Sequence, residues 1–203
     1  MALFDLLKNQ VTSQMKREAS KAVNSAAQSA SQAIAKGRNH TESFTFASLP
    51  TNLAQLQALP EASLDSAFKT TARCIAVLCT LEKDANATWE MLDYLKGPED
   101  VNEREKSFIK ERLAGKQYKT LSFFKGATPE NGYTPVTPYT ITVSENPYSF
   151  DEENWATLYV TSGGADAPRP IKLRRKPSTN QWFVNDIQCL ADIRIPTGQD
   201  AWA

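Results

Sequence analysis

Residues 170–185, PIKLRRKPSTNQWFVN, contain the pattern that decides the fold of this chain. Apolar Ile171 and Leu173 alternate with basic residues, and an alternation of period two is typical of a β-strand with one buried face. Residues 177–180 then combine proline, serine, threonine and asparagine, which favour a tight turn. The stretch therefore predicts a β-hairpin with antiparallel strands.

The rest of the chain extends this pattern into a β-rich second half behind a helical first half. Residues 139–143 and 155–161 show the same alternation, and a run near Ile193 and Ile195 predicts a last strand. Before residue 116, apolar residues recur at helical spacing instead. The predicted fold class is α+β, with about three core helices packed on an antiparallel sheet of about four to five strands.

Three helices are predicted between residues 65 and 115. The first begins at Asp65 or Ser66 and runs to about Leu81, and the second begins at Asp84 and ends at Gly97. The third begins at Asn102, because an asparagine followed three residues later by a glutamate gives a capping-box pattern. In this third helix the residues expected to face the core are Phe108, Ile109 and Leu113.

The sequence divides into three parts. Residues 1–36 predict one amphipathic helix, because apolar and small residues recur at steps of three and four. Residues 37–43 are polar and predict a linker. Residues 44–203 predict a single α+β domain, which begins with an extended stretch and a short helical turn between Pro50 and Pro60. The bulky apolar residues of the predicted N-terminal helix include Leu3, Phe4, Leu7, Val11 and Met15.

The predicted N-terminal helix is an assembly or docking element in our interpretation. Alanine and serine in its second half permit close helix approach, which favours self-association or a protein partner. Peripheral attachment to a membrane surface is an alternative, and weak packing on its own domain is another.

Composition limits the compartment and the partners. The 203 residues include 23 lysines and arginines against 23 acidic residues, so no overall field favours nucleic acid. Three cysteines without a CxxC pair predict a reduced, cytoplasmic protein. No segment approaches the ~18 apolar residues of a transmembrane helix, and the start lacks the apolar stretch of a signal peptide.

Three runs carry a resemblance to a known family: LDYLKGPE at residues 92–99, FKGATPENGY at 124–133 and TVSENPYSFDEENWATLYVTSGGADAPRPIKLR at 142–174. Over residues 44–202 the chain resembles a family of uncharacterised bacterial proteins classed as a domain of unknown function. The resemblance implies no activity and no site residues, and it implies a link to tellurium-resistance or stress-response genes.

The sequence favours a non-enzymatic protein. His40 is the only histidine and lies in the polar linker, which removes serine–histidine and cysteine–histidine pairs and histidine metal sites. No phosphate-binding loop, dinucleotide fingerprint or nucleophile elbow is present. We therefore predict no catalytic residue, no cofactor and no metal ion.

Candidate interaction residues lie in the β-rich half. Lys172, Arg174 and Lys176 alternate along one strand and predict a basic stripe that could bind phosphate or an acidic partner, although a solvated sheet face is favoured. The stripe has no interleaved aromatic residues that would favour single-stranded nucleic acid. The loop at residues 146–155 adds Tyr148, Phe150 and Trp155 beside three acidic residues. Its carboxylates could form a paired-carboxylate or calcium site, although a solvated turn is favoured.

Residues 162–164, Ser-Gly-Gly, and the nearby Arg169 are a further candidate for interaction. Their backbone amides could cradle an anion, although the glycines more often supply positive φ for a tight connection.

These observations favour a cytoplasmic interaction or scaffolding module of unknown partner. The domain would present its sheet and the loops of residues 146–169, and the N-terminal helix would mediate assembly. A second hypothesis is a small-molecule or anion-binding domain with a pocket between helices and sheet. The residues expected to line such a pocket are Trp89, Tyr139, Trp155, Tyr159 and Trp182.

Overall fold

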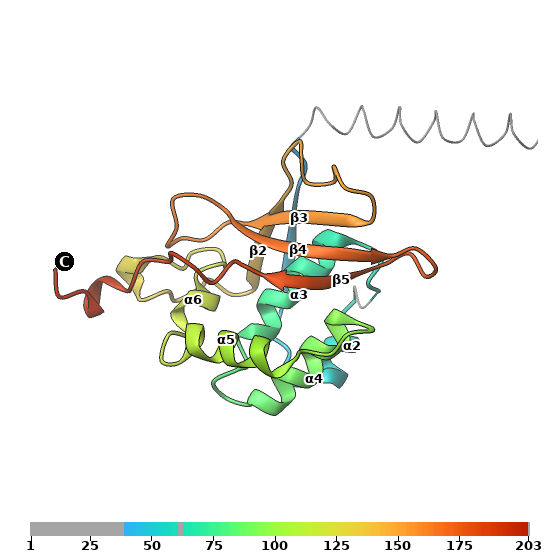
Figure 1. The fold of residues 1–203 in the computed structure, drawn as a ribbon. Helices are drawn as coiled ribbons and strands as arrows, with labels where there is room; N and C mark the ends of the chain where they lie inside the picture. Colours follow the sequence, from blue (N-terminus) through green and yellow to red (C-terminus); the bar gives the residue numbers. More distant parts are fainter. Residues whose placement is uncertain (1–38, 61–62, 203) are drawn as a thin grey trace, which may run out of the picture. The chain divides into compact units, whose positions relative to one another are not determined.

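The structure, a computed structural model, describes residues 39–60 and 63–202. The predicted helix of residues 1–36 lies outside them, and so do its candidate residues Leu3, Phe4, Leu7, Val11 and Met15. From His40 onward the chain forms one compact unit, in which a sheet packs on a layer of helices (Figure 1). The elements in chain order are β1 (Thr41–Phe46), α2 (Leu53–Gln57), α3 (Ala67–Leu78), α4 (Ala85–Lys96), α5 (Glu103–Leu113), α6 (Tyr118–Leu121), η1 (Pro129–Asn131), β2 (Tyr139–Ser144), β3 (Trp155–Val160), β4 (Arg169–Lys176), β5 (Gln181–Ile187) and η2 (Thr197–Gln199).

The sheet is antiparallel throughout and confirms the α+β class. Its five strands lie in the order β1-β2-β3-β4-β5, so neighbours in space are neighbours in sequence. The predicted hairpin is formed by β4 and β5, with Lys176 opposite Gln181. Because β5 is at one end of this order, one of its sides pairs with no other strand of residues 39–60 and 63–202.

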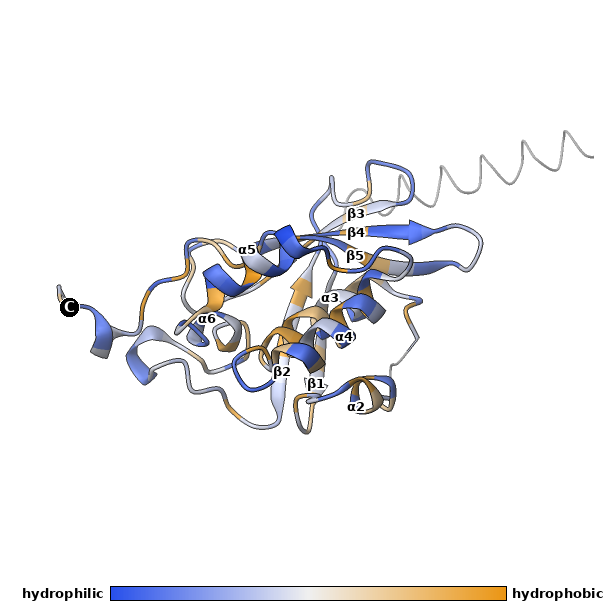
Figure 2. Ribbon diagram, turned by 60° about the horizontal axis from the view of Figure 1, so that its bottom comes forward, coloured by the Kyte–Doolittle hydropathy of each residue, from blue (hydrophilic) through white to orange (hydrophobic). Residues whose placement is uncertain are grey.

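Helix α3 is the centre of the core. It packs against all five strands and also against α4 and α6. Cys74, Ile75, Ala76 and Val77 are fully buried in it. In Figure 2, α3 is coloured mainly as hydrophobic, whereas α5 is mainly hydrophilic. The apolar faces of helices and strands therefore meet at α3, and α5 contributes only one buried edge.

The predicted helix starts are confirmed by side-chain caps. Ser66 Oγ accepts from the Lys69 backbone N–H, and Asp84 Oδ1 accepts from that of Ala87 at 2.9 Å. Asn102 and Glu105 form the predicted capping box, in which each side chain accepts from the other residue's backbone N–H. These bonds satisfy backbone donors that a helix end leaves free.

Several boundaries differ from the predictions. Helix α3 ends at Leu78 instead of about Leu81, and the Thr80 hydroxyl donates to Pro50 O at 2.8 Å. The strand predicted near Ile193 and Ile195 is wrong, because those residues are in irregular structure. There the Arg194 backbone N–H donates to Gly164 O, a loop residue.

Two further differences concern the ends of the helical half. β1 begins at Thr41, so the last residues of the predicted linker are part of the sheet. The short helix α6 extends the helical part beyond residue 116. Phe108 does not face the core as expected, since 43% of its surface is exposed, whereas Ile109 and Leu113 are buried. Adjacent helical residues differ by about 100° in direction, and the narrow buried face of α5 includes Ile109 and Leu113 but not Phe108.

The prediction of positive φ at Gly163 and Gly164 is wrong. The positive-φ glycines among the described residues are Gly97, Gly115, Gly126 and Gly132. A Cβ atom at Gly163 would lie 1.9 Å from Ala127 O, and one at Gly164 would lie 2.1 Å from Tyr133 Oη. Close approach of neighbouring groups, and not backbone conformation, is what requires glycine here.

Candidate functional site

The predicted basic stripe lies on the open face of the sheet. Lys172, Arg174 and Lys176 are exposed, whereas Ile171 and Leu173, which alternate with them, are buried, as the pattern predicts. This face therefore carries the charges of β4 away from the core.

Aromatic residues interleave with this stripe across the strands, although the sequence of β4 alone does not contain them. Trp155 of β3 and Phe183 of β5 both lie opposite Arg174 in the strand register. The Arg174 guanidinium lies 5.2 Å from the centre of the Trp155 ring, a cation–π distance. This contact places the Arg174 guanidinium over an aromatic ring on the open face of the sheet.

The other predicted loop residues are separated. Tyr148 is exposed between β2 and β3. Phe150 turns back to the domain, with its ring 5.8 Å from Trp182 and 6.5 Å from Phe68. Arg169, at the start of β4, donates to Asp192 O at 2.7 Å. This hydrogen bond connects the start of β4 to the irregular segment after β5.

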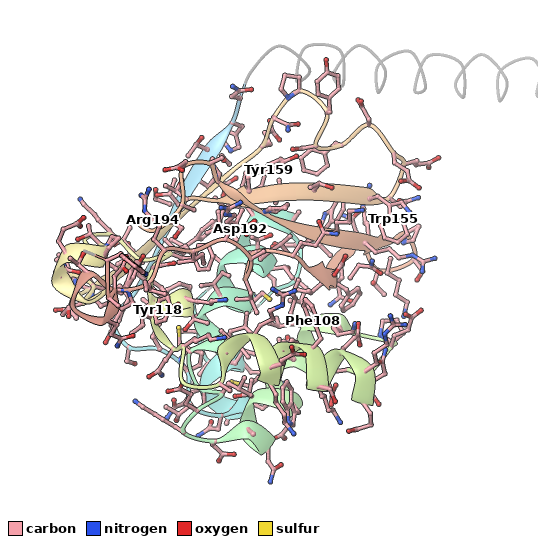
Figure 3. The ribbon with its side chains drawn as sticks, turned by 60° about the vertical axis from the view of Figure 1, so that its left-hand side comes forward. Phe108, Tyr118, Trp155, Tyr159, Asp192 and Arg194 are labelled. Atoms are coloured by element: carbon pink, nitrogen blue, oxygen red, sulfur yellow. The ribbon has the colours of Figure 1, made fainter. Side chains whose placement is uncertain are left out.

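The predicted aromatic pocket is not formed. Trp155 and Tyr159 alternate with the buried residues of β3 and so lie on the face away from the helices. Figure 3 shows both along β3, on the other side of the sheet from α5. Trp89 is buried on α4, and Tyr139 packs edge-on against Phe124. Strand alternation thus places Trp155 and Tyr159 on the open face of the sheet, whereas Trp89 is buried on a helix on the other side.

A hollow of about 390 Å³ lies between α5 and β5. We call it the α5 hollow. Figure 3 shows Phe108 at this place, between α5 and the sheet. Its lining combines apolar side chains with charged ones. Its lining residues are Lys96, Val101, Asn102, Arg104, Glu105, Phe108, Ile109, Val184, Asn185, Asp186 and Ile187.

A second hollow of about 290 Å³ lies beside the turn of the β4–β5 hairpin. We call it the hairpin hollow. It is bounded by the end of α4 on one side and by the strand ends on the other, and four of its residues are basic. The residues that line the hairpin hollow are Lys96, Pro98, Glu99, Arg174, Arg175, Lys176, Pro177, Phe183, Val184 and Asn185.

The two hollows adjoin, because Lys96, Val184 and Asn185 line both. Together they form one feature along β5, which we call the β5 groove. Val184 and Asn185 come from the edge strand, and Lys96 is the last residue of α4. Gly97 then turns the chain with φ of 75°, and the Phe183 ring occupies the space that a side chain there would fill.

A salt bridge holds the centre of the β5 groove. Lys96 Nζ donates to Glu105 Oε1 at 2.6 Å, and the Lys96 side chain is only 10% exposed. Glu105 also caps α5, so the same carboxylate fixes the helix start and neutralises the lysine. The charge of Lys96 is thus already paired within the domain.

The basic residues at the end of β4 have no such partner. In the part of the chain that the structure describes, no carboxylate lies within ion-pair distance of Arg174, Arg175 or Lys176. Arg175 donates instead to Asn180 Oδ1, and its Nε is buried without a hydrogen-bond partner. The hairpin hollow consequently has an excess of positive charge that the domain itself does not neutralise.

Local sequence patterns predict one side of this groove but not the other. Arg174 and Lys176 were predicted from strand alternation. Phe108 and Lys96 were missed, because their role depends on how α4 and α5 lie beside β5. One signal was present: on so hydrophilic a helix as α5, a phenylalanine one residue before Ile109 falls off the buried face.

The chain was compared with known proteins. The family described as Domain of unknown function (DUF6935) matches residues 48–197, which is more than half of the chain. The chain belongs to the DUF6935 family. No curated protein and no solved structure matches it. Every residue that lines the β5 groove lies within the DUF6935 match.

Other chemistry in the DUF6935 domain was also considered. Within residues 39–60 and 63–202, no helix is both long and apolar enough to cross a membrane. The same residues contain no cluster of histidine, cysteine and acidic side chains that could hold a metal ion. Burial raises the pKa of Cys74 and Cys79 to about 12, so both thiols stay protonated at neutral pH.

Proposed function

We propose that this domain is a non-enzymatic protein-binding module and that its partner binds in the β5 groove. The observation that carries the proposal is the juxtaposition of two hollows of different character along one edge strand. The α5 hollow offers apolar side chains, and the hairpin hollow offers charges without partners. Apolar anchors beside arginine are common at the centres of protein interfaces.

Exposure of Phe108 supports this choice of surface. A phenylalanine with 43% of its surface exposed adjoins a hollow that would bury it if a partner filled the space. The Arg112 guanidinium lies 5.1 Å from its ring centre and covers part of the ring from the outside. Burial of apolar area contributes about 25 cal/mol per Å² to association, before the cost of ordering the partner.

The burial of the cysteine thiols also supports a binding module over an enzyme with a cysteine nucleophile. Each of the three cysteine thiols is buried in the core, and burial raises its pKa, so none is suited to attack a substrate. His40 pairs with Glu42 at the start of β1. We further propose that residues 1–36 mediate self-association or docking in the cytoplasm, and that the membrane surface is the alternative partner for them.

A small-molecule site is the second candidate function. The α5 hollow, at about 390 Å³, falls within the roughly 300–1,000 Å³ range of ligand pockets. Its open side towards the hairpin hollow favours a longer, peptide-like ligand over a compact one.

The test is selection of a random peptide library displayed on phage against the full chain. Enriched peptides are then measured against Phe108→Ser and against Ile195→Ser. Ile195 is the matched control, because it is 44% exposed and lies outside the groove. We expect Phe108→Ser to abolish binding and Ile195→Ser to leave it unchanged. Peptides that bind both variants equally would contradict the proposal.

A further inference from the structure

We infer that the partner of the β5 groove is an acidic segment, in which an apolar side chain enters the α5 hollow and carboxylates reach the hairpin hollow. This inference rests on the proposed function and names the chemistry of the partner. It is argued from the charges that the domain leaves unpaired, from the way these charges are held and from the free edge of β5.

The charge balance of the hairpin hollow points to an anionic partner. Four basic residues line it, against a single acidic one, Glu99. The Lys96 charge is already paired with Glu105, which leaves Arg174, Arg175 and Lys176. Carboxylates that bind there would form charge-assisted hydrogen bonds, and arginine can form two to one carboxylate.

The arginines are held in place before any partner binds. Arg174 lies against the Trp155 ring, and Arg175 lies 6.0 Å from the centre of the Trp182 ring while it donates to Asn180. Fixing a long side chain on binding costs conformational entropy, and these contacts reduce that cost. The Arg175 Nε is buried and has no hydrogen-bond partner among the described residues, so the guanidinium nitrogens beyond it are the ones that a partner could reach.

The edge of β5 sets where a partner chain can lie. The Trp182 backbone N–H donates to Leu64 O at 2.7 Å, and its C=O accepts from Thr70 Oγ1 at 3.1 Å, so both point away from β4. Backbone directions alternate along a strand, so those of Val184 also point away from β4, towards the groove that Val184 lines. The backbone N–H and C=O of Trp182 are therefore already bonded within the domain. Val184 is the next residue of β5 whose backbone groups point to that side, so a partner chain could pair with it.

An acidic protein segment fits these observations better than nucleic acid does. Asp186 lies opposite Lys172 on β4, and Glu99 stands at the rim of the hairpin hollow. These acidic groups would repel a continuous polyanion, whereas a short segment needs only the local excess at the end of β4. The Trp155 face is already occupied by Arg174, which leaves less of the ring for base stacking.

The experiment compares matched probes by fluorescence polarisation with the full chain. One fluorescein-labelled peptide has a leucine followed by consecutive aspartates, and its counterpart has asparagines instead. A single-stranded oligodeoxythymidine is the polyanion probe. The variants are Phe108→Ser, Arg174→Gln combined with Lys176→Gln, and Lys172→Gln as the control, because Lys172 lies on the same face of β4 but outside the groove.

We expect the acidic peptide to bind about tenfold more tightly than its amide counterpart, with weaker binding at high salt. The double variant should lose about the same factor, and Lys172→Gln should lose little. Equal binding of the two peptides overturns this inference, and if that binding still requires Phe108 the proposed function stands. Binding that is independent of Phe108 overturns both. Tighter binding of the oligonucleotide, with the same dependence on Arg174 and Lys176, overturns the inference in favour of nucleic acid.

Discussion

At the residue scale, burial makes the three cysteine thiols unreactive because it raises their pKa. Cys74, Cys79 and Cys189 are free and buried, and the pKa of each is raised because the thiolate would lose its hydration. Cys79, which follows the last residue of α3, also donates through Sγ to Ile75 O at 3.4 Å, a weak hydrogen bond. These thiols are core residues in which the protonated form is part of the packing.

Ionisation of Cys79 predicts a loss of stability at alkaline pH. In the unfolded chain its pKa is near the ordinary thiol value of 9.0, whereas burial raises the pKa to about 12 in the folded chain, so only the unfolded state ionises between these values. The stability that this thiol contributes is therefore complete below pH 9 and is lost as pH rises towards 12, at about 1.4 kcal/mol per pH unit. Urea unfolding of the wild type and of Cys79→Ala at several pH values measures it. Parallel pH profiles for the two proteins would show that Cys79 does not cause the loss.

Gly97 predicts a second effect at this scale. A Cβ atom there would lie 2.3 Å from the Phe183 ring, and the φ of 75° is unfavourable for other residues. Gly97→Ala should destabilise the domain by about 2–4 kcal/mol through strain and overpacking. Gly115→Ala is the control: its φ is 64°, but nothing lies within 4 Å, so we expect about 1 kcal/mol. Thermal unfolding compares them, and equal losses would show that Phe183 does not matter.

At the scale of elements, α5 is attached to the domain by its first turn and by one buried edge. Asn102 and Glu105 close the capping box, Glu105 binds Lys96, and Ile109 and Leu113 enter the core. The other faces of α5 are hydrophilic and are not packed against the core, and one of them forms a wall of the α5 hollow. The position of Phe108 thus depends on contacts at the start of the helix.

Removal of the cap should therefore affect both stability and the groove. Asn102→Ala should cost about 1 kcal/mol, because the Glu105 backbone N–H loses its acceptor. Asn52→Ala is the matched control, since Asn52 caps α2 in the same way, through the Gln55 N–H. Both should lower the midpoint of chemical unfolding, and only Asn102→Ala should weaken peptide binding in the groove. Equal weakening by both variants would contradict the role of α5.

At the scale of the whole molecule, the folded domain and residues 1–36 can be tested separately if the chain is cut before β1. His40 O accepts from the Glu145 backbone N–H at 2.9 Å, so the sheet needs the chain from about His40. A truncated chain should consequently begin at Asn39, before β1, and not within it. Residues 1–36 then remain as the part that we propose for assembly.

Light scattering tests this proposal. We expect a larger molar mass per particle for the full chain than for residues 39–203, with unchanged thermal unfolding of the domain. The physical reason is that a narrow apolar stripe is buried when helices associate. If both chains are monomeric, self-association is wrong and docking to another molecule is the alternative. Flotation with anionic vesicles then tests the membrane surface, and a full chain that does not float would contradict it.

Much of the fold could be predicted because its causes are local. Ser66, Asp84 and Asn102 cap helices through bonds that reach only three residues along the chain. The alternation in β4 follows from strand geometry, which places successive side chains on opposite faces. The strand at β1 was predicted only as an extended stretch, because its pairing partner, β2, lies about a hundred residues away in the sequence.

The sequence by itself determined the α+β class, the helix starts and the basic stripe at Lys172, Arg174 and Lys176. Only the tertiary structure decided that Trp155 and Phe183 lie opposite Arg174, and that Phe108 faces a hollow instead of the core. The physical reason is that caps and periodicities act through neighbours in the chain. The β5 groove instead collects side chains from α4, α5 and the β4–β5 hairpin, whose proximity depends on how the helices pack beside the edge of the sheet.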